Sequence, residues 1–269
     1  MPADARTESM RTPAAGIEGH AEVVVAPTGR GPWGPWSTLL IGFGIVAVGY
    51  LLAPIGCVVM IQAGLAGTAF ADLATDEVLL FNVGTSAAGV VVLALVGAAV
   101  LARGGPSLAD YLALRPVRVG GLLPWLGAVM LLMIGYDALC LAAGISPYPE
   151  HWLALFRLQS WPLSLLLVFV VVAPLTEEIL FRGFVLSGLE SLRGGTFVPV
   201  AVSAVLWTLL HVGGDGHSGE LVYVFGLGLL LGYARLAADS VLMPLGVHAI
   251  NNLAAWFSLT GLVRLLPVS

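Results

Sequence analysis

Long apolar stretches alternate with short polar ones along most of this chain. Seven stretches approach the length of about 20 apolar residues that a membrane-spanning helix needs. They cover residues 38–64, 79–102, 122–145, 162–189, 197–212, 220–237 and 241–262. The fifth is short, while the fourth is long and contains Pro174, which predicts a tilted or interrupted helix. The pattern predicts an all-α, polytopic membrane protein with about seven transmembrane helices.

Composition supports this fold class. Hydrophobic residues make up 58% of the 269 residues and charged residues only 10%, whereas a soluble domain carries about a quarter of charged residues. Cys57 and Cys140 both lie in apolar stretches, which is typical of small buried side chains rather than of a disulfide framework or a metal site. We expect the lipid bilayer as the environment of the chain and no nucleic acid as a partner.

The chain divides into three parts. Residues 1–35 are polar, with Pro, Gly and mixed charges, and predict a disordered tail. The first apolar stretch begins only near Leu39, too late for a signal peptide, so we expect it to remain as a membrane anchor. Residues 36–150 contain the first three predicted spans, and residues 160–260 contain the remaining four.

The arginines predict the orientation in the membrane. If the N-terminus is cytoplasmic, most of the arginines outside the spans fall on the cytoplasmic side, and only Arg157 and Arg264 fall opposite. The cytoplasmic group is Arg6, Arg11, Arg30, Arg103, Arg115, Arg118, Arg193 and Arg235. An excess of basic residues in cytoplasmic loops is the rule for such proteins. We therefore expect a multi-pass protein of the bacterial cytoplasmic membrane with its N-terminus in the cytoplasm.

Charged side chains interrupt the fourth apolar stretch. Glu178 and Arg182 are four residues apart, so on a helix they share a face and can form an ion pair. Glu177 points about 100° away from them and has no such partner on its own helix. One carboxylate is then held ionised, and the other is free to face a cavity and to exchange a proton.

Two further polar clusters lie on the fifth and seventh stretches. His211 follows Trp207 by one helical turn, and His248 and Asn252 are likewise four residues apart. Ionisable groups inside a membrane tend to face the interior of the helix bundle or a hydrated path. At 1.5 Å of rise per residue, Glu177, His211, His248 and Asn252 all lie on the order of 10–20 Å from the cytoplasmic ends of their helices. These spacings predict one shared cavity.

A glutamate with two histidines is compatible with two kinds of hydrolytic site. In one, Glu177, His211 and His248 bind Zn²⁺ with a water in the open position. In the other, a glutamate is the general base for a water held by a histidine, while His and Asn donors stabilise the oxyanion. Both sites would hydrolyse an amide bond.

Three motifs carry a resemblance to a known family. EEILFR (177–182), WTLLH (207–211) and HAINN (248–252) stand in order on separate spans. They resemble the signature of the CPBP family of intramembrane proteases, which includes the type II CAAX prenyl endopeptidases and bacteriocin-immunity-type relatives. Trp207 occupies a position where this family usually has Phe. The resemblance covers roughly residues 160–260 and implies a helical membrane protease that acts on a membrane-associated peptide or protein, without requiring a prenylated substrate.

The resemblance also implies roles for single residues. The expected catalytic set is Glu177, Glu178, His211, His248 and Asn252, with Arg182 and Trp207 in supporting positions. Glu177 would activate water, His211 would help to hold the water or a metal ion, and His248 and Asn252 would form the oxyanion site.

Two other functions use the same residues differently. A proton-coupled transporter would use the intramembrane acids for transport, although the sequence has no evident inverted repeat. A non-catalytic immunity or scaffold protein would instead bind another membrane protein.

Overall fold

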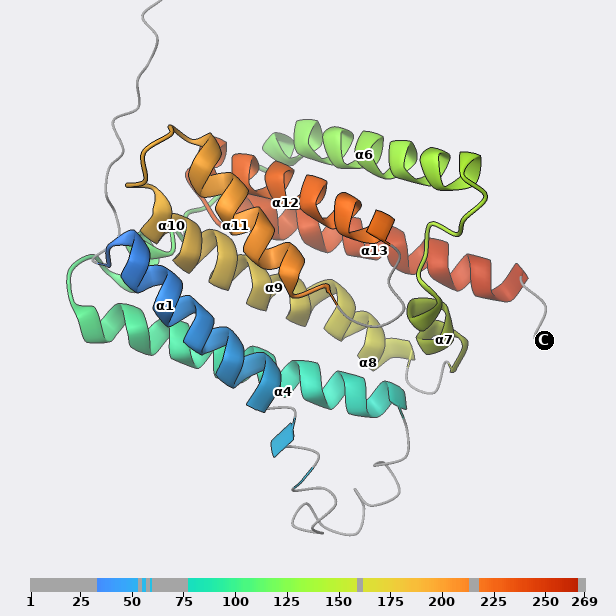
Figure 1. Cartoon of the computed structure of the whole chain (residues 1–269), viewed down its shortest axis with the longest axis horizontal. Helices are drawn as coiled ribbons and strands as arrows, with labels where there is room; N and C mark the ends of the chain where they lie inside the picture. Colours follow the sequence, from blue (N-terminus) through green and yellow to red (C-terminus); the bar gives the residue numbers. More distant parts are fainter. Residues whose placement is uncertain are drawn as a thin grey trace, which may run out of the picture.

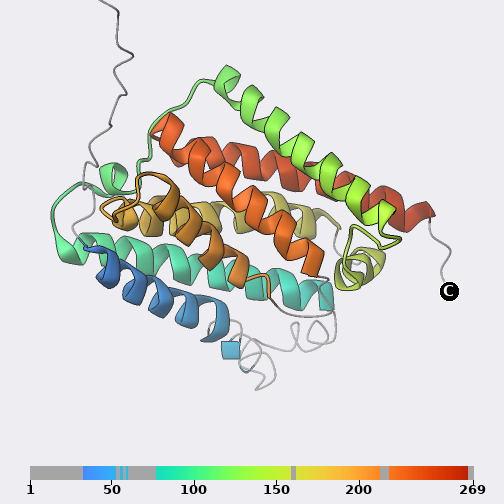
Figure 2. The same ribbon diagram turned by 45° about the horizontal axis from the view of Figure 1, so that its top comes forward.

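The computed structural model describes residues 33–52, 55–56, 59, 77–158, 162–212 and 218–265. The described residues form helices and connecting loops, without β-strands, and the long helices pack side by side as a bundle (Figures 1 and 2). A helix lies at each of the seven predicted stretches, which confirms the fold class. The long helical stretches are Pro35–Leu52 (α1 and η1), α4 (Glu77–Arg103), α6 (Leu123–Ala142), Pro162–Leu189 (α8 to α10), α11 (Phe197–Leu209), α12 (Ser218–Ala238) and α13 (Leu242–Leu265).

Five of these stretches are long and apolar enough to cross a membrane. In the described part of the chain they are Pro35–Leu52, Val78–Arg103, Val119–Ala142, Pro162–Leu189 and Gly219–Ala238. Of the two that fall short, α11 has only 13 residues, and α13 has 24 residues but carries His248, Asn251 and Asn252. The protein is therefore an integral multi-pass membrane protein, while the count of seven spans stays a prediction.

The fourth span is one continuous helical stretch whose hydrogen-bonding pattern changes along its length. Regular turns in α8 (Pro162–Leu167), α9 (Ala173–Glu178) and α10 (Leu186–Leu189) alternate with two wider π-helical segments, η4 (Val168–Val172) and η5 (Ile179–Val185). Pro174 lies just after η4 inside this continuous stretch and has no N–H to donate to the preceding turn, and the Phe169 carbonyl of η4 accepts a hydrogen bond from Asn252 of α13. The helix thus accommodates Pro174 without the interruption that the sequence also allowed.

Glycines bring several helices into close contact. A Cβ atom at Gly232 of α12 would come within 2.7 Å of Val200 Cγ1 on α11, and one at Gly228 within 3.0 Å of the Ala204 Cβ. Similarly, a Cβ at Gly89 of α4 would lie 2.7 Å from the Thr176 hydroxyl oxygen in α9. Small residues allow such approach where helices pack in lipid. These contacts hold α12 against α11, and α4 against the fourth span, which carries Glu177.

The arginine-bearing loops between spans lie together at one end of the bundle. Arg115, beyond the short helix α5 (Leu108–Tyr111), forms an ion pair with Asp239 at the turn between α12 and α13. Arg235 reaches Glu190 at the end of α10 at 3.8 Å. The opposite end holds α7 (Glu150–Leu158), with Arg157, and the end of α13, with Arg264 (Figure 1). The sequence predicted this grouping of most arginines at one end of the bundle. The disordered tail predicted for residues 1–35 lies almost entirely outside the described residues.

Candidate active site

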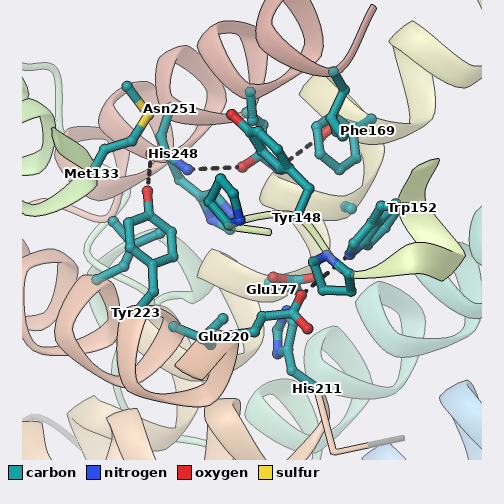
Figure 3. A pocket seen from close by; sticks show the side chains of 18 of the residues that line it. Met133, Tyr148, Trp152, Phe169, Glu177, His211, Glu220, Tyr223, His248 and Asn251 are labelled. Carbon is teal, nitrogen blue, oxygen red and sulfur yellow. Dashed lines mark hydrogen bonds between the residues drawn. The ribbon is translucent and has the colours of Figure 1, made fainter. Parts of the chain in front are cut away.

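A cavity of about 290 Å³ lies among the helices and collects the polar residues of three spans. Glu177 reaches it from α9, His211 from just beyond the end of α11, and His248 from α13 (Figure 3). Asn252 of α13 also lines it. The predicted convergence of these four side chains on one cavity is confirmed by their positions. Most of the remaining lining is aromatic or aliphatic, so few water molecules compete with the polar groups.

Trp207 connects the other polar residues of the site. Its indole N–H donates to Glu177 Oε2, with 2.7 Å between the two atoms. The edges of the His211 and His248 rings meet the indole at centroid distances of 5.0 and 5.4 Å. The guanidinium of Arg182 lies 4.5 Å from the indole centroid, a cation–π contact. Trp207 is 1% exposed, so its position is fixed by packing.

Glu178 lies behind the cavity and is fully buried. Its Oε1 atom accepts a hydrogen bond from Arg182 at 2.9 Å, which confirms the predicted pairing. The same oxygen lies 2.8 Å from His248 Nδ1, and Arg182 also donates to the Gly228 carbonyl at 3.1 Å. Glu178 is absent from the residues that line the cavity within the described chain. Its contacts are those of a residue that orients His248, rather than of one that touches a substrate.

The hydrogen bonds assign the tautomers of both histidines. His211 Nδ1 lies 3.1 Å from the Trp207 carbonyl oxygen, which can only accept, so Nδ1 carries the proton. His248 Nδ1 faces the Glu178 carboxylate in the same way. In the neutral form of each ring, Nε2 then has a free lone pair. Both histidines can therefore accept a proton or a hydrogen bond through Nε2.

The two asparagines of α13 form a fixed pair. Asn252 donates to the Phe169 carbonyl at 2.9 Å and accepts a hydrogen bond from Asn251 at 3.2 Å. Asn251 accepts from the Tyr223 hydroxyl at 2.7 Å, a hydrogen bond between α12 and α13. Asn251 nevertheless lines the same cavity as Asn252. Among the described residues Asn252 donates this one side-chain hydrogen bond, so its second amide hydrogen is available to a ligand.

The far part of the cavity was not predicted. It is lined by side chains from α6, α7, α12 and the loop before α7, where Trp152 donates to Glu220 at 3.2 Å. Burial raises the pKa of Tyr148 in that loop, so its phenol stays neutral. The spacing of these residues along the sequence does not distinguish them from residues that only pack between helices. Only Asp137, an acid inside an apolar stretch, was recognisable from the sequence.

The three expected zinc ligands, Glu177, His211 and His248, meet only some of the requirements of a metal site. Both histidines have an occupied Nδ1 and a free Nε2, the arrangement common in metal-binding imidazoles. Within the described chain, however, no three His, Cys, Asp or Glu side chains are grouped closely enough to hold a metal ion. Glu177, His211 and His248 thus do not form a three-ligand site in this arrangement, and we derive no step through a metal.

Comparison with known families identifies the segment that carries the site. Residues 159–254 match the model of the family described as type II CAAX prenyl endopeptidase Rce1-like. This segment contains an Rce1-like domain. It includes every residue of the expected catalytic set, while α1, η1, α4 and α6 lie outside it. The match points to an intramembrane protease.

A search of curated proteins gives one further similarity. The chain is 32% identical over 132 residues to an uncharacterised 24.3 kDa protein of Escherichia coli. The similarity covers 46% of this chain and 58% of that protein. No solved structure matches the chain.

Proposed function

We propose that this protein is an intramembrane endopeptidase in which Glu177 activates a water molecule for attack on a peptide bond. The observation that carries the proposal is the meeting of Glu177, His211, His248 and Asn252 at one cavity inside an Rce1-like domain. The substrate class is a membrane-associated peptide or protein, since the cavity lies among membrane-spanning helices.

The first step would form the carbon–oxygen bond. Trp207 occupies Oε2 of Glu177, so Oε1 is left to accept a proton from water. As that proton moves to Glu177, the water oxygen attacks the carbonyl carbon, and the carbonyl oxygen takes up negative charge. The free amide hydrogen of Asn252 would donate to this oxyanion. His248, oriented through Nδ1 by Glu178, would add an Nε2–H donor in its protonated form.

The second step would break the carbon–nitrogen bond. Glu177 returns its proton to the leaving amine, which gives a new carboxyl terminus and a new amino terminus. His211 Nε2 faces the same cavity and would accept a hydrogen bond from the attacking water. General base catalysis of this kind contributes about 10²–10⁴-fold to a rate.

The proposed orientation has the arginine-rich end in the cytoplasm of a bacterium. It is supported by the grouping of Arg115 and Arg235 at one end of the bundle. Reporter fusions at the N-terminus and within residues 190–196 should both report a cytoplasmic location. A periplasmic signal from either would reject this orientation.

Zinc binding would be an alternative way to activate the water, and it would require Glu177, His211 and His248 to come closer together than they are in this arrangement. A bound ion would act as a Lewis acid and lower the pKa of its water. Stoichiometric zinc in the purified protein, lost in a His211→Ala/His248→Ala double variant, would establish it. Peptide cleavage that survives complete chelation would instead favour the carboxylate-activated water.

Transport and non-catalytic binding make different predictions from proteolysis. The decisive comparison is between membrane proteomes of cells that contain the wild-type protein, Glu177→Gln or Glu150→Gln. Glu150 is exposed and pairs with Arg157, so Glu150→Gln controls for the loss of one carboxylate. We expect cleavage products that require Glu177 and persist in Glu150→Gln. Identical product sets in wild type and Glu177→Gln would reject the protease and leave transport or scaffolding.

A further inference from the structure

Tyr50 is a half-buried tyrosine of the cavity that belongs to the N-terminal helices. It lies in η1 (Ala47–Leu52), well outside the Rce1-like match. Its side chain lines the same cavity as Glu177. No role for it follows from the three sequence motifs.

The Tyr50 hydroxyl is buried and lacks a hydrogen-bond partner among the described residues. Three other donors of the cavity have protein partners: Trp207 donates to Glu177, Tyr223 to Asn251 and Tyr136 to the Pro147 carbonyl. An unsatisfied buried hydroxyl costs about 1–3 kcal/mol. Such a group calls for an explanation, and a bound ligand is one that supplies the missing partner.

Packing holds Tyr50 in this position. A Cβ atom on the neighbouring Gly49 would clash with Val92 of α4, so η1 lies directly against α4 at this point. One turn earlier on α4, Gly89 is in equally close contact with Thr176, the residue before Glu177. Both η1, which carries Tyr50, and α9, which carries Glu177, therefore pack against α4. This one helix sets the position of the phenol relative to the carboxylate. The backbone of η1 is also π-helical, a form that is frequent at functional sites.

We propose that Tyr50 is a catalytic residue whose hydroxyl donates a hydrogen bond to the carbonyl oxygen of the peptide bond under attack. This inference rests on the proposed protease function. The carbonyl oxygen gains negative charge as water adds to the carbonyl carbon. A neutral donor with no protein partner therefore forms a stronger hydrogen bond to this oxygen in the transition state than in the substrate. Tyr50 would thereby join Asn252 in stabilising the oxyanion, and the N-terminal helices would complete the site of the Rce1-like domain.

The test is Tyr50→Phe, which removes one oxygen atom and keeps the ring. The matched control is Tyr111→Phe, since Tyr111 is buried against Phe184 and does not line the cavity. The probe is a synthetic peptide copied from a cleavage product that requires Glu177. With purified protein in liposomes, we expect kcat to fall about 10²–10³-fold in Tyr50→Phe, with KM changed only slightly. The melting temperature should stay the same or rise, because an unsatisfied polar group has been removed.

The possible outcomes separate this inference from the proposed function. If Glu177→Gln abolishes cleavage while Tyr50→Phe retains the wild-type kcat, the role of Tyr50 is rejected and the protease remains. An equal loss in Tyr111→Phe, or a drop in melting temperature that accounts for the lost activity, would also overturn the role of Tyr50. If no product depends on Glu177, the protease fails and the role of Tyr50 fails with it.

Discussion

The indole nitrogen of Trp207 lies 2.7 Å from Oε2 of Glu177, and these two residues come from different spans. The bond occupies one of the two carboxylate oxygens of Glu177, which lines the cavity. The same indole contacts both histidines and Arg182. Trp207 thus aligns the proposed base with the other groups of the site, although it does not itself take part in proton transfer.

Replacing Trp207 by Phe should reduce kcat about tenfold. A hydrogen bond to a charged group contributes about 1.5–3 kcal/mol, and Phe keeps a ring but loses the N–H donor. Peptide cleavage and thermal unfolding of the purified variant are the measurements. Trp256→Phe is the control, because Trp256 packs on Phe156 away from Glu177. Unchanged kcat in Trp207→Phe would show that the bond does not align Glu177.

The buried ion pair of Glu178 and Arg182 should be required for folding. Both side chains are 0% exposed, and removing one partner of a buried pair costs about 3–5 kcal/mol. We expect Arg182→Met to lower the melting temperature and the yield of folded protein sharply. A double variant, Glu178→Gln with Arg182→Met, should recover part of this loss because no isolated charge remains. Equal stability of wild type and Arg182→Met would contradict the burial of the pair.

Gly232 should tolerate no larger side chain. Its Cβ position is 2.7 Å from Val200 Cγ1, so Gly232→Val would force α11 and α12 apart. Overpacking of this kind costs about 1–3 kcal/mol. Because α11 carries Trp207 and His211, we expect lower activity together with a lower melting temperature. Gly127→Val is the matched control, since nothing lies within 4 Å of its Cβ position, and a comparable loss there would argue against tight packing at Gly232.

The sequence predicted the fold class and much of the site for identifiable reasons. Spans follow from hydropathy, and the pairing of Glu178 with Arg182 follows from helical periodicity. Contacts between helices that lie far apart in the sequence do not follow from hydropathy or from helical periodicity. The bond from Trp207 to Glu177 and the packing of Glu178 behind His248 depend on how α9, α11 and α13 are rotated.

Two other features had no signal in the sequence. The π-helical turns on either side of Ala173–Glu178 change which residues face the cavity, and regular 3.6-residue spacing cannot anticipate them. Tyr50 is an ordinary aromatic residue in an apolar stretch, so only its place in the cavity together with its unsatisfied hydroxyl distinguishes it in the folded chain.

The most direct test of the central claim is the rate of peptide cleavage by purified Glu177→Gln in liposomes. The probe is the synthetic peptide used for Tyr50→Phe, and Glu150→Gln is the control. The account predicts a fall in kcat of about 10²–10⁴-fold with an unchanged melting temperature, because the general base is lost while its hydrogen bond to Trp207 can persist. A Glu177→Gln protein that cleaves the peptide at the wild-type rate would contradict it.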